Sequence, residues 1–349
     1  MSRAIEYLVA LAISLCGCSG PESSPEPITG RFEVQGPVYE IGSSGADESQ
    51  LYFGDATDAI LLPGDSVLLV LDNIQKNLSL VSVSGDRLFT AGRSGGGPEE
   101  FRHADGLALL GSTAWVLDRG NGRMALWELQ GDTIALERVI PLPLEPEKGG
   151  ICVTANEAFL YGGRVGSPIH RFDHEGNHQA SIGSLFGDER MEPILRGASS
   201  SGPFRCDAAQ DEILVSSRLL GVVRSHDRSG ELRWERQIPT FARVEMSTTE
   251  RGGYRFSNPS EPNEDGVADL LVTIWTVDGI VGVQEASDVR RNSDRDLVDV
   301  RTTILDRATG EVMHRTQELP HIKHVIGDWA VSLVNDPYPV IRLYRWTLE

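Results

Sequence analysis

The residues Gly92-Arg93-Ser94-Gly95-Gly96 match the pattern G-x-S-x-G, in which a serine can act as a nucleophile. That chemistry requires a strand, a sharp turn and then a helix, so that the hydroxyl is exposed beside a base. In this chain Gly97-Pro98 follows without a helical pattern, and the Lys-Ser/Thr pair of a phosphate-binding loop is missing. We therefore interpret the stretch as a connection whose glycines allow close approach of the backbone.

His170, His174 and His178 are spaced by four residues, which on a helix would place them on one face and suit a metal ion. The intervening Glu175-Gly176-Asn177 is typical of a hairpin turn, so we expect solvated side chains on two strands and their turn. His321 and His324 belong to no such pattern, and we interpret them as incidental.

Asn292, Asp294 and Asp296 alternate like the ligands of a calcium-binding loop. Such a loop needs Gly at its sixth position and Glu at its twelfth, and Leu297 and Thr303 stand there instead. This excludes the standard loop, whereas an irregular site of oxygen ligands stays an open alternative.

The first 30 residues have the composition of a targeting sequence followed by a flexible tether. The apolar run over residues 7–15 is too short for a permanent membrane span and is typical of a signal peptide. Leu15-Cys16-Gly17-Cys18 resembles the bacterial lipobox, which predicts a signal peptide over residues 1–17 and lipid attachment at Cys18. An ordinary secreted protein cleaved after a small residue is the alternative. Residues 18–30, rich in Ser, Pro and Glu, are expected to form a flexible tether.

Two further cysteines, Cys152 and Cys206, lie in short apolar stretches. In an oxidising compartment they can form a disulfide. Two buried free thiols are the alternative, because a single pair of cysteines defines no framework.

The chain is strongly acidic, with 51 Asp and Glu against 32 Lys and Arg and a net charge of −19. Such a surface repels phosphate backbones and anionic lipids. We therefore exclude nucleic acid as a partner and expect membrane contact only through the lipid anchor.

Apolar runs of four to seven residues recur along the rest of the chain, separated by Gly, Asp, Asn and Ser, and helical periodicity is nearly absent. This pattern predicts an all-β fold. The runs repeat about every 45–50 residues, which suits a unit of four strands. In five units a glycine-containing turn precedes the fourth run: Ser84-Gly85-Asp86, Gln130-Gly131-Asp132, Glu175-Gly176-Asn177, Ser229-Gly230-Glu231 and Thr309-Gly310-Glu311.

The sixth unit lacks a fourth run, while a strand-like stretch over residues 32–41 is left over at the other end. Pairing it with residues 340–346 would complete the last sheet and close a ring, which removes exposed sheet edges. The sequence therefore predicts a six-bladed β-propeller over residues 31–349, its last blade closed by the N-terminal strand.

Residues 92–101 and the stretch Val116-Leu117-Asp118-Arg119-Gly120-Asn121-Gly122-Arg123 resemble the NHL-type repeat. The chain is similar to the six-bladed propeller lipoproteins of bacteria, in which a G-x-G-x-G-P-x-x-F-like connection joins successive blades. The resemblance implies this fold and a place in the bacterial cell envelope, at the outer membrane or facing the periplasm. It leaves activity open, because such propellers include binding platforms and a few enzymes.

Three long segments, residues 183–203, 243–269 and 286–296, join blades or link second and third strands. In a propeller these two kinds of connection share one face, and long loops on a rigid scaffold commonly carry binding. We expect an anionic or sugar-like ligand, or an acidic partner segment, to bind there. The side chains offered are Arg93, Arg119, Asn121, Arg164, Arg218, Tyr254, Arg255, Arg290, Arg291 and Tyr338.

Some six-bladed propellers are metal-dependent hydrolases or lactonases with carboxylates around the central channel. The corresponding candidates in this chain are Asp58, Asp105, Asp207 and Asp269, with a divalent ion such as calcium as cofactor. Asp is also common before strands because of turn chemistry. We therefore expect a monomeric, non-catalytic domain that binds an envelope protein, a peptide or a glycan, or serves as a scaffold. A metal-dependent hydrolase or lactonase is the alternative.

Overall fold

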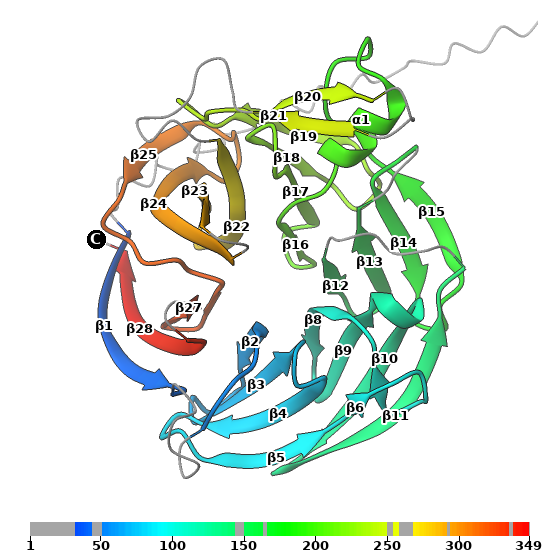
Figure 1. The fold of residues 1–349 in the computed structure, drawn as a ribbon, viewed down its shortest axis with the longest axis vertical. Coiled ribbons are helices and arrows are strands. Elements are labelled where there is room, and N and C mark those ends of the chain that lie inside the picture. Colours follow the sequence, from blue (N-terminus) through cyan, green and yellow to red (C-terminus); the bar gives the residue numbers. More distant parts are fainter. Residues whose placement is uncertain are drawn as a thin grey trace, which may run out of the picture.

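The strands form a ring of six four-stranded antiparallel sheets (Figure 1). The computed structural model describes residues 32–43, 51–143, 150–162, 166–249, 254–257, 268–291, 294–334 and 338–348. The all-β, six-bladed propeller expected from the sequence is confirmed.

Five blades are built from consecutive strands, which follow one another from the channel outwards. Blade 1 has β2 (Ala56–Leu61), β3 (Val67–Asp72), β4 (Asn77–Ser82) and β5 (Arg87–Ala91), and blade 2 has β8 (Ala104–Leu110), β9 (Thr113–Asp118), β10 (Arg123–Gln130) and β11 (Thr133–Pro141). Blade 3 has β12 (Ile151–Val153), β13 (Glu157–Tyr161), β14 (Ile169–Asp173) and β15 (His178–Ile182). Blade 4 has β16 (Phe204–Asp207), β17 (Glu212–Ser217), β18 (Val222–His226) and β19 (Leu232–Gln237), and blade 5 has β22 (Asp269–Val277), β23 (Ile280–Arg291), β24 (Asp294–Asp306) and β25 (Val312–Thr316).

Blade 6 joins the two ends of the described chain. It contains β26 (His324–Ile326), β27 (Trp329–Val334) and β28 (Val340–Leu348), and its outermost strand is β1 (Phe32–Ile41). Strand β1 pairs antiparallel with β28, from Phe32 opposite Leu348 to Ile41 opposite Ile341. The predicted closure of the ring by the N-terminal strand is confirmed.

The core is divided into six clusters of buried apolar side chains, each lying between two neighbouring blades. Trp127 and Phe101, for example, pack between blades 1 and 2. Because both faces of each sheet are covered, the middle strands are apolar along their length instead of alternating. In β3 all residues from Leu68 to Asp72 are buried. This explains why continuous apolar runs marked the strands in the sequence.

The glycines of the five predicted turns all have positive φ, between +63° and +96° (Gly85, Gly131, Gly176, Gly230 and Gly310). Each turn joins the third and fourth strands of its blade, where glycine adopts this backbone conformation without strain.

Two connections differ from the sequence interpretation. Residues 286–296, interpreted as a loop, belong mostly to the hairpin of β23 and β24, whose pairing runs from Ile280 opposite Asp306 to Arg291 opposite Asp294. The polar sequence hid these strands because backbone pairing, and not apolar periodicity, defines them. Residues 183–203 contain a short helix, α1 (Pro193–Ser199), and residues 243–269 contain the hairpin of β20 (Glu245–Thr248) and β21 (Tyr254–Ser257).

No helix among the described residues is long and apolar enough to cross a membrane. The proposed signal peptide, Cys18 and the tether lie outside the residues that the structure describes.

Candidate binding site in the central channel

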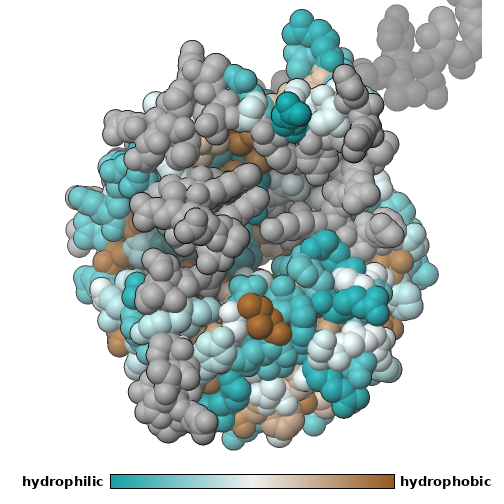
Figure 2. Space-filling view, in the orientation of Figure 1, coloured by the Kyte–Doolittle hydropathy of each residue, from teal (hydrophilic) through white to brown (hydrophobic). Residues whose placement is uncertain are grey.

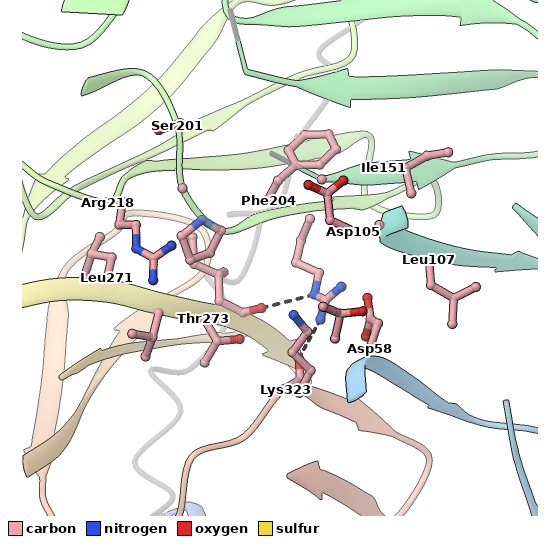
Figure 3. A pocket seen from close by; sticks show the side chains of 18 residues that line it. Asp58, Asp105, Leu107, Ile151, Ser201, Phe204, Arg218, Leu271, Thr273 and Lys323 are labelled. Atoms are coloured by element: carbon pink, nitrogen blue, oxygen red, sulfur yellow. Dashed lines mark hydrogen bonds between the residues drawn. The ribbon is translucent and has the colours of Figure 1, made fainter. Parts of the chain in front are cut away.

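The inner strands surround a cavity of about 270 Å³ (Figure 3). Blades 1 to 5 contribute to its wall, together with Lys323, which lies directly before the first strand of blade 6. The lining residues are Thr57, Asp58, Asp105, Gly106, Leu107, Gly150, Ile151, Ser201, Gly202, Pro203, Phe204, Arg205, Arg218, Leu271, Val272, Thr273, Ile274 and Lys323.

The cavity lies at the end of the channel where the blade connections enter. Ser201 belongs to the segment between blades 3 and 4, and Arg218 begins the turn between β17 and β18. The Arg218 backbone N–H donates to the carbonyl of Ser201 at 2.9 Å, so the two kinds of connection meet there. The cavity therefore shares a face with these connections, which we call the loop-bearing face.

A buried polar chain crosses the channel between blades 4, 6 and 1. Arg205 Nη2 donates to His324 Nδ1 at 2.6 Å, and His324 Nε2 contacts Asp58 Oδ1 at 2.5 Å. Arginine can only donate hydrogen bonds, so His324 Nδ1 is the acceptor. His324 Nε2 therefore carries the ring proton and donates a hydrogen bond to the Asp58 carboxylate. Arg205 also donates to the carbonyls of Ile274 and Lys323, at 3.1 and 2.6 Å. The interpretation of His324 as incidental is therefore wrong.

The charges of this chain follow from its surroundings. Burial, with the nearby charge of Arg205, lowers the pKa of the His324 imidazole to about 4. Burial alone would raise the pKa of the Asp58 carboxyl, but His324, Lys323 and Arg205 together hold that pKa below its usual range. At neutral pH this row of three side chains thus consists of the Asp58 carboxylate, the neutral His324 imidazole and the Arg205 guanidinium.

We expect the free energy of unfolding to fall as the pH drops from about 6.5 to 4, because the unfolded chain takes up a proton on histidine that folded His324 resists. The contribution reaches roughly 3 kcal/mol at pH 4. Urea denaturation of the wild type and His324→Gln at several pH values measures it, since titrating groups that do not interact with His324 cancel in the difference. Parallel profiles for the two proteins would contradict the assignment.

The four proposed channel carboxylates have separate partners. Asp58 and Asp105 line the cavity, and Arg119 Nε donates to Asp105 Oδ2 at 2.9 Å. Asp207 and Asp269 are not among the lining residues: Asp207 pairs with Arg307 at 2.7 Å, and Asp269 pairs with Arg301. In the described part of the chain no group of three or more acidic, His or Cys residues suits a metal ion. These carboxylates do not fit a divalent ion unless they give up their present partners.

We expect chelation of divalent ions to leave the thermal midpoint of the protein unchanged, because arginine or histidine already compensates each of these carboxylates. Metal analysis and thermal unfolding with and without EDTA check this. A stoichiometric metal whose removal lowers the midpoint would instead favour the hydrolase alternative.

The proposed surface residues have different environments. The Arg93 side chain is 75% exposed and pairs with Glu100 at 2.9 Å. Arg119 bonds Asp105, and Arg218 lines the cavity. Arg255 is exposed and Tyr338 is half-buried, while Arg164 and the side chains of Tyr254, Arg290 and Arg291 lie outside the described part. Among the described side chains of this set, the structure brings Arg119 and Arg218 to the channel.

Asn121 belongs to a buried network centred on Asp118. The fully buried Asp118 carboxylate accepts from the backbone N–H of Arg102 and His103, from Asn121 Nδ2 at 2.6 Å and from Arg123 Nε at 3.2 Å. Asn121 and Arg123 also donate to the carbonyls of Gly95 and Gly97. The network fixes residues 92–101 against the turn between β9 and β10, so Asn121 has a structural role in this arrangement.

Gly95 shows why this connection is rich in glycine. Its φ is +150°, and a Cβ there would lie 2.1 Å from Glu100 Oε2. Gly92, the first glycine of the G-x-S-x-G match, is similar: its φ is +88°, and a Cβ there would lie 2.5 Å from the Phe101 ring. Asp72 at the end of β3 has a role like that of Asp118, since it accepts from the N–H groups of Gly54, Asp55, Ile74 and Gln75. The repeated Val-Leu-Asp in the sequence was the available signal for both residues.

The three spaced histidines divide into two groups. His170 Nδ1 and His178 Nε2 each lie 2.9 Å from Ser181 Oγ on the β14–β15 pair. His174 contacts the carbonyl of Thr154 at 2.9 Å and packs on Trp115. They occupy two strands and the turn between them, as expected.

Cys152 and Cys206 are joined by a disulfide, with their Cα atoms 5.9 Å apart. The bridge links β12 to β16, the inner strands of blades 3 and 4. Each cysteine neighbours a cavity-lining residue, Ile151 or Arg205, so the bridge fixes the spacing of the cavity wall.

Comparison with known proteins supports the fold alone. No protein family matches the chain by sequence, and no curated protein is similar to it. A member of the DUF4221 family from Bacteroides vulgatus superposes with a TM-score of 0.58 at 10% identity, over 91% of this chain and 99% of that one. A protein from Bacteroides fragilis, described as exported, gives a TM-score of 0.52 at 10% identity, over 91% and 95% of the two chains. The chain is thus a six-bladed propeller similar in fold to bacterial proteins.

Proposed function

We propose that this protein is a lipid-anchored β-propeller of the bacterial cell envelope that binds, without turnover, another envelope component on its loop-bearing face. One observation carries the proposal: the cavity lined by five blades and by Lys323 lies on the face where the blade connections meet. Recognition sites are commonly built from loops that a rigid scaffold, such as this ring of sheets, holds in position.

The chemistry of the cavity favours binding over hydrolysis. His324 uses both ring nitrogens, one toward Arg205 and one toward Asp58, so neither is left to act as a base. The cavity-lining Asp105 bonds Arg119. These described groups stabilise one another and are not arranged to activate a nucleophile.

The surface also suits a polar partner. On the face seen in Figure 2, hydrophilic residues predominate and hydrophobic ones are scattered singly among the described residues. Isolated apolar side chains are normal on a soluble surface and do not form a docking patch.

The anchor is part of the proposal, and it rests on the lipobox-like Leu15-Cys16-Gly17-Cys18. A tether over residues 18–30 would place the propeller roughly 20 Å from the membrane on average. We expect Cys18→Ala to release the protein from the membrane fraction, whereas Cys16→Ala should leave it there. Release of both variants, or of neither, would contradict attachment at Cys18.

Affinity capture with the full chain tests the binding role. Ser201→Trp fills the cavity wall on the loop-bearing face, and Thr133→Trp places the same bulk at the β10–β11 turn on the opposite face. We expect envelope components captured by the wild type to be retained by Thr133→Trp and lost with Ser201→Trp. Equal capture by both variants would contradict recognition at this face.

A further inference from the structure

The cavity concentrates positive charge within an acidic protein. Three cations line it, Arg205, Arg218 and Lys323, against two carboxylates, Asp58 and Asp105, which leaves one excess positive charge. Arg119 outside the wall adds a second by pairing with Asp105. The whole chain carries a net charge of −19, so this local sign is opposite to the average.

Several of these charged side chains already form hydrogen bonds within the protein. Arg205 serves the carbonyls of Ile274 and Lys323 and the imidazole of His324. Asp58 bonds His324. Among the described residues, no carboxylate lies within ion-pair distance of the Lys323 ammonium, although Asp58 is close enough for their charges to interact. The half-buried Lys323 therefore keeps three donors for a ligand.

We propose that the cavity binds the anionic group of a small organic acid, a carboxylate or a phosphoryl group, through Lys323 with Arg218. This proposal rests on the proposed binding role and specifies its ligand. Figure 3 shows Lys323 and Arg218 on either side of Thr273. A ligand anion between them would meet an ammonium, a guanidinium and a hydroxyl, which together favour oxyanions.

The rest of the cavity wall determines which kind of group can lie next to the acid group of the ligand. Phe204 and Ile151 lie across the cavity from the two cations in Figure 3, with Asp105 beside them, and Leu107 lies further along the same wall. These apolar side chains suit a ring or a short hydrocarbon next to the acid group. The volume of about 270 Å³ is near the lower end of the range for ligand pockets, roughly 300–1,000 Å³, so the ligand is small.

Calorimetry on the full chain in mild detergent tests the proposal with benzoate, galacturonate and inorganic phosphate as anions. Benzamide and galactose are the neutral counterparts of the first two. We expect at least one of the three anions to bind, and we expect benzamide and galactose not to bind. Lys323→Met should weaken that binding about tenfold to a hundredfold, as expected for loss of a charge-assisted contact. Lys76→Met, which removes the same charge at another half-buried lysine bonded to Asn73, should bind as the wild type does.

The choice of anions distinguishes a phosphoryl group from a carboxylate as the group that the cavity binds. Binding of phosphate alone assigns a phosphoryl group, and binding of benzoate or galacturonate assigns a carboxylate. The proposal is overturned if no anion binds, or if Lys323→Met and Lys76→Met bind equally well. Loss of capture by Ser201→Trp alongside either of those results would show that the face still recognises its partner by other chemistry.

Discussion

Replacing Asp118 by Ala is expected to lower the free energy of unfolding by about 3–5 kcal/mol. The substitution leaves the buried guanidinium of Arg123 without its carboxylate and removes the acceptor of two backbone N–H groups. It also frees Asn121 from the turn that holds residues 92–101. Urea denaturation of the full chain, followed by tryptophan fluorescence, measures the loss.

Asp86→Ala is the matched control for this prediction. Asp86 is also a turn carboxylate with hydrogen bonds, to Ser82 and Ser84, but it is exposed to solvent. Its removal should change stability by no more than about 0.5 kcal/mol. Equal effects of the two substitutions would mean that the Asp118 network does not hold residues 92–101 against the turn between β9 and β10.

Replacing both Cys152 and Cys206 by Ala is expected to lower the free energy of unfolding by about 4 kcal/mol, the loop-closure entropy for a cross-link across 54 residues. The bridge ties together the inner strands of two blades, so its loss also loosens the wall of the cavity. Denaturation with and without a reducing agent measures the effect.

The reducing agent supplies the control. It should lower the stability of the wild type toward that of the double variant and leave the variant unchanged. If the reductant has no effect on the wild type, the two cysteines are free thiols in the protein, and the alternative left open by the sequence holds.

The parts of the fold that the sequence predicted follow from local rules of the backbone. A hairpin turn that needs positive φ selects glycine, and five such turns marked the first five of the six blades. The surplus strand over residues 32–41 had to pair because an open ring exposes its edges. Both signals can be read without knowing what lies across the channel.

The site could not be predicted in the same way, because its contacts join distant parts of the chain. Asp58 and His324 are 266 residues apart in sequence, and Arg205 and His324 are 119 apart. No residue near His324 in the sequence indicates that its side chain links Arg205 to Asp58 across the channel. The hydrogen bond of Asn121 to Asp118 escaped the sequence for a related reason: the partner carboxylate is near in sequence, but only the fold shows that the two side chains meet.

The central claim is that the loop-bearing face recognises another component of the envelope. Crosslinking in intact cells tests it most directly, with a photoreactive amino acid at the exposed position 93 on that face or at the exposed position 132 on the opposite face. We predict a crosslinked adduct from position 93 and none from position 132. Adducts from position 132 alone, or from both positions equally, would contradict the claim.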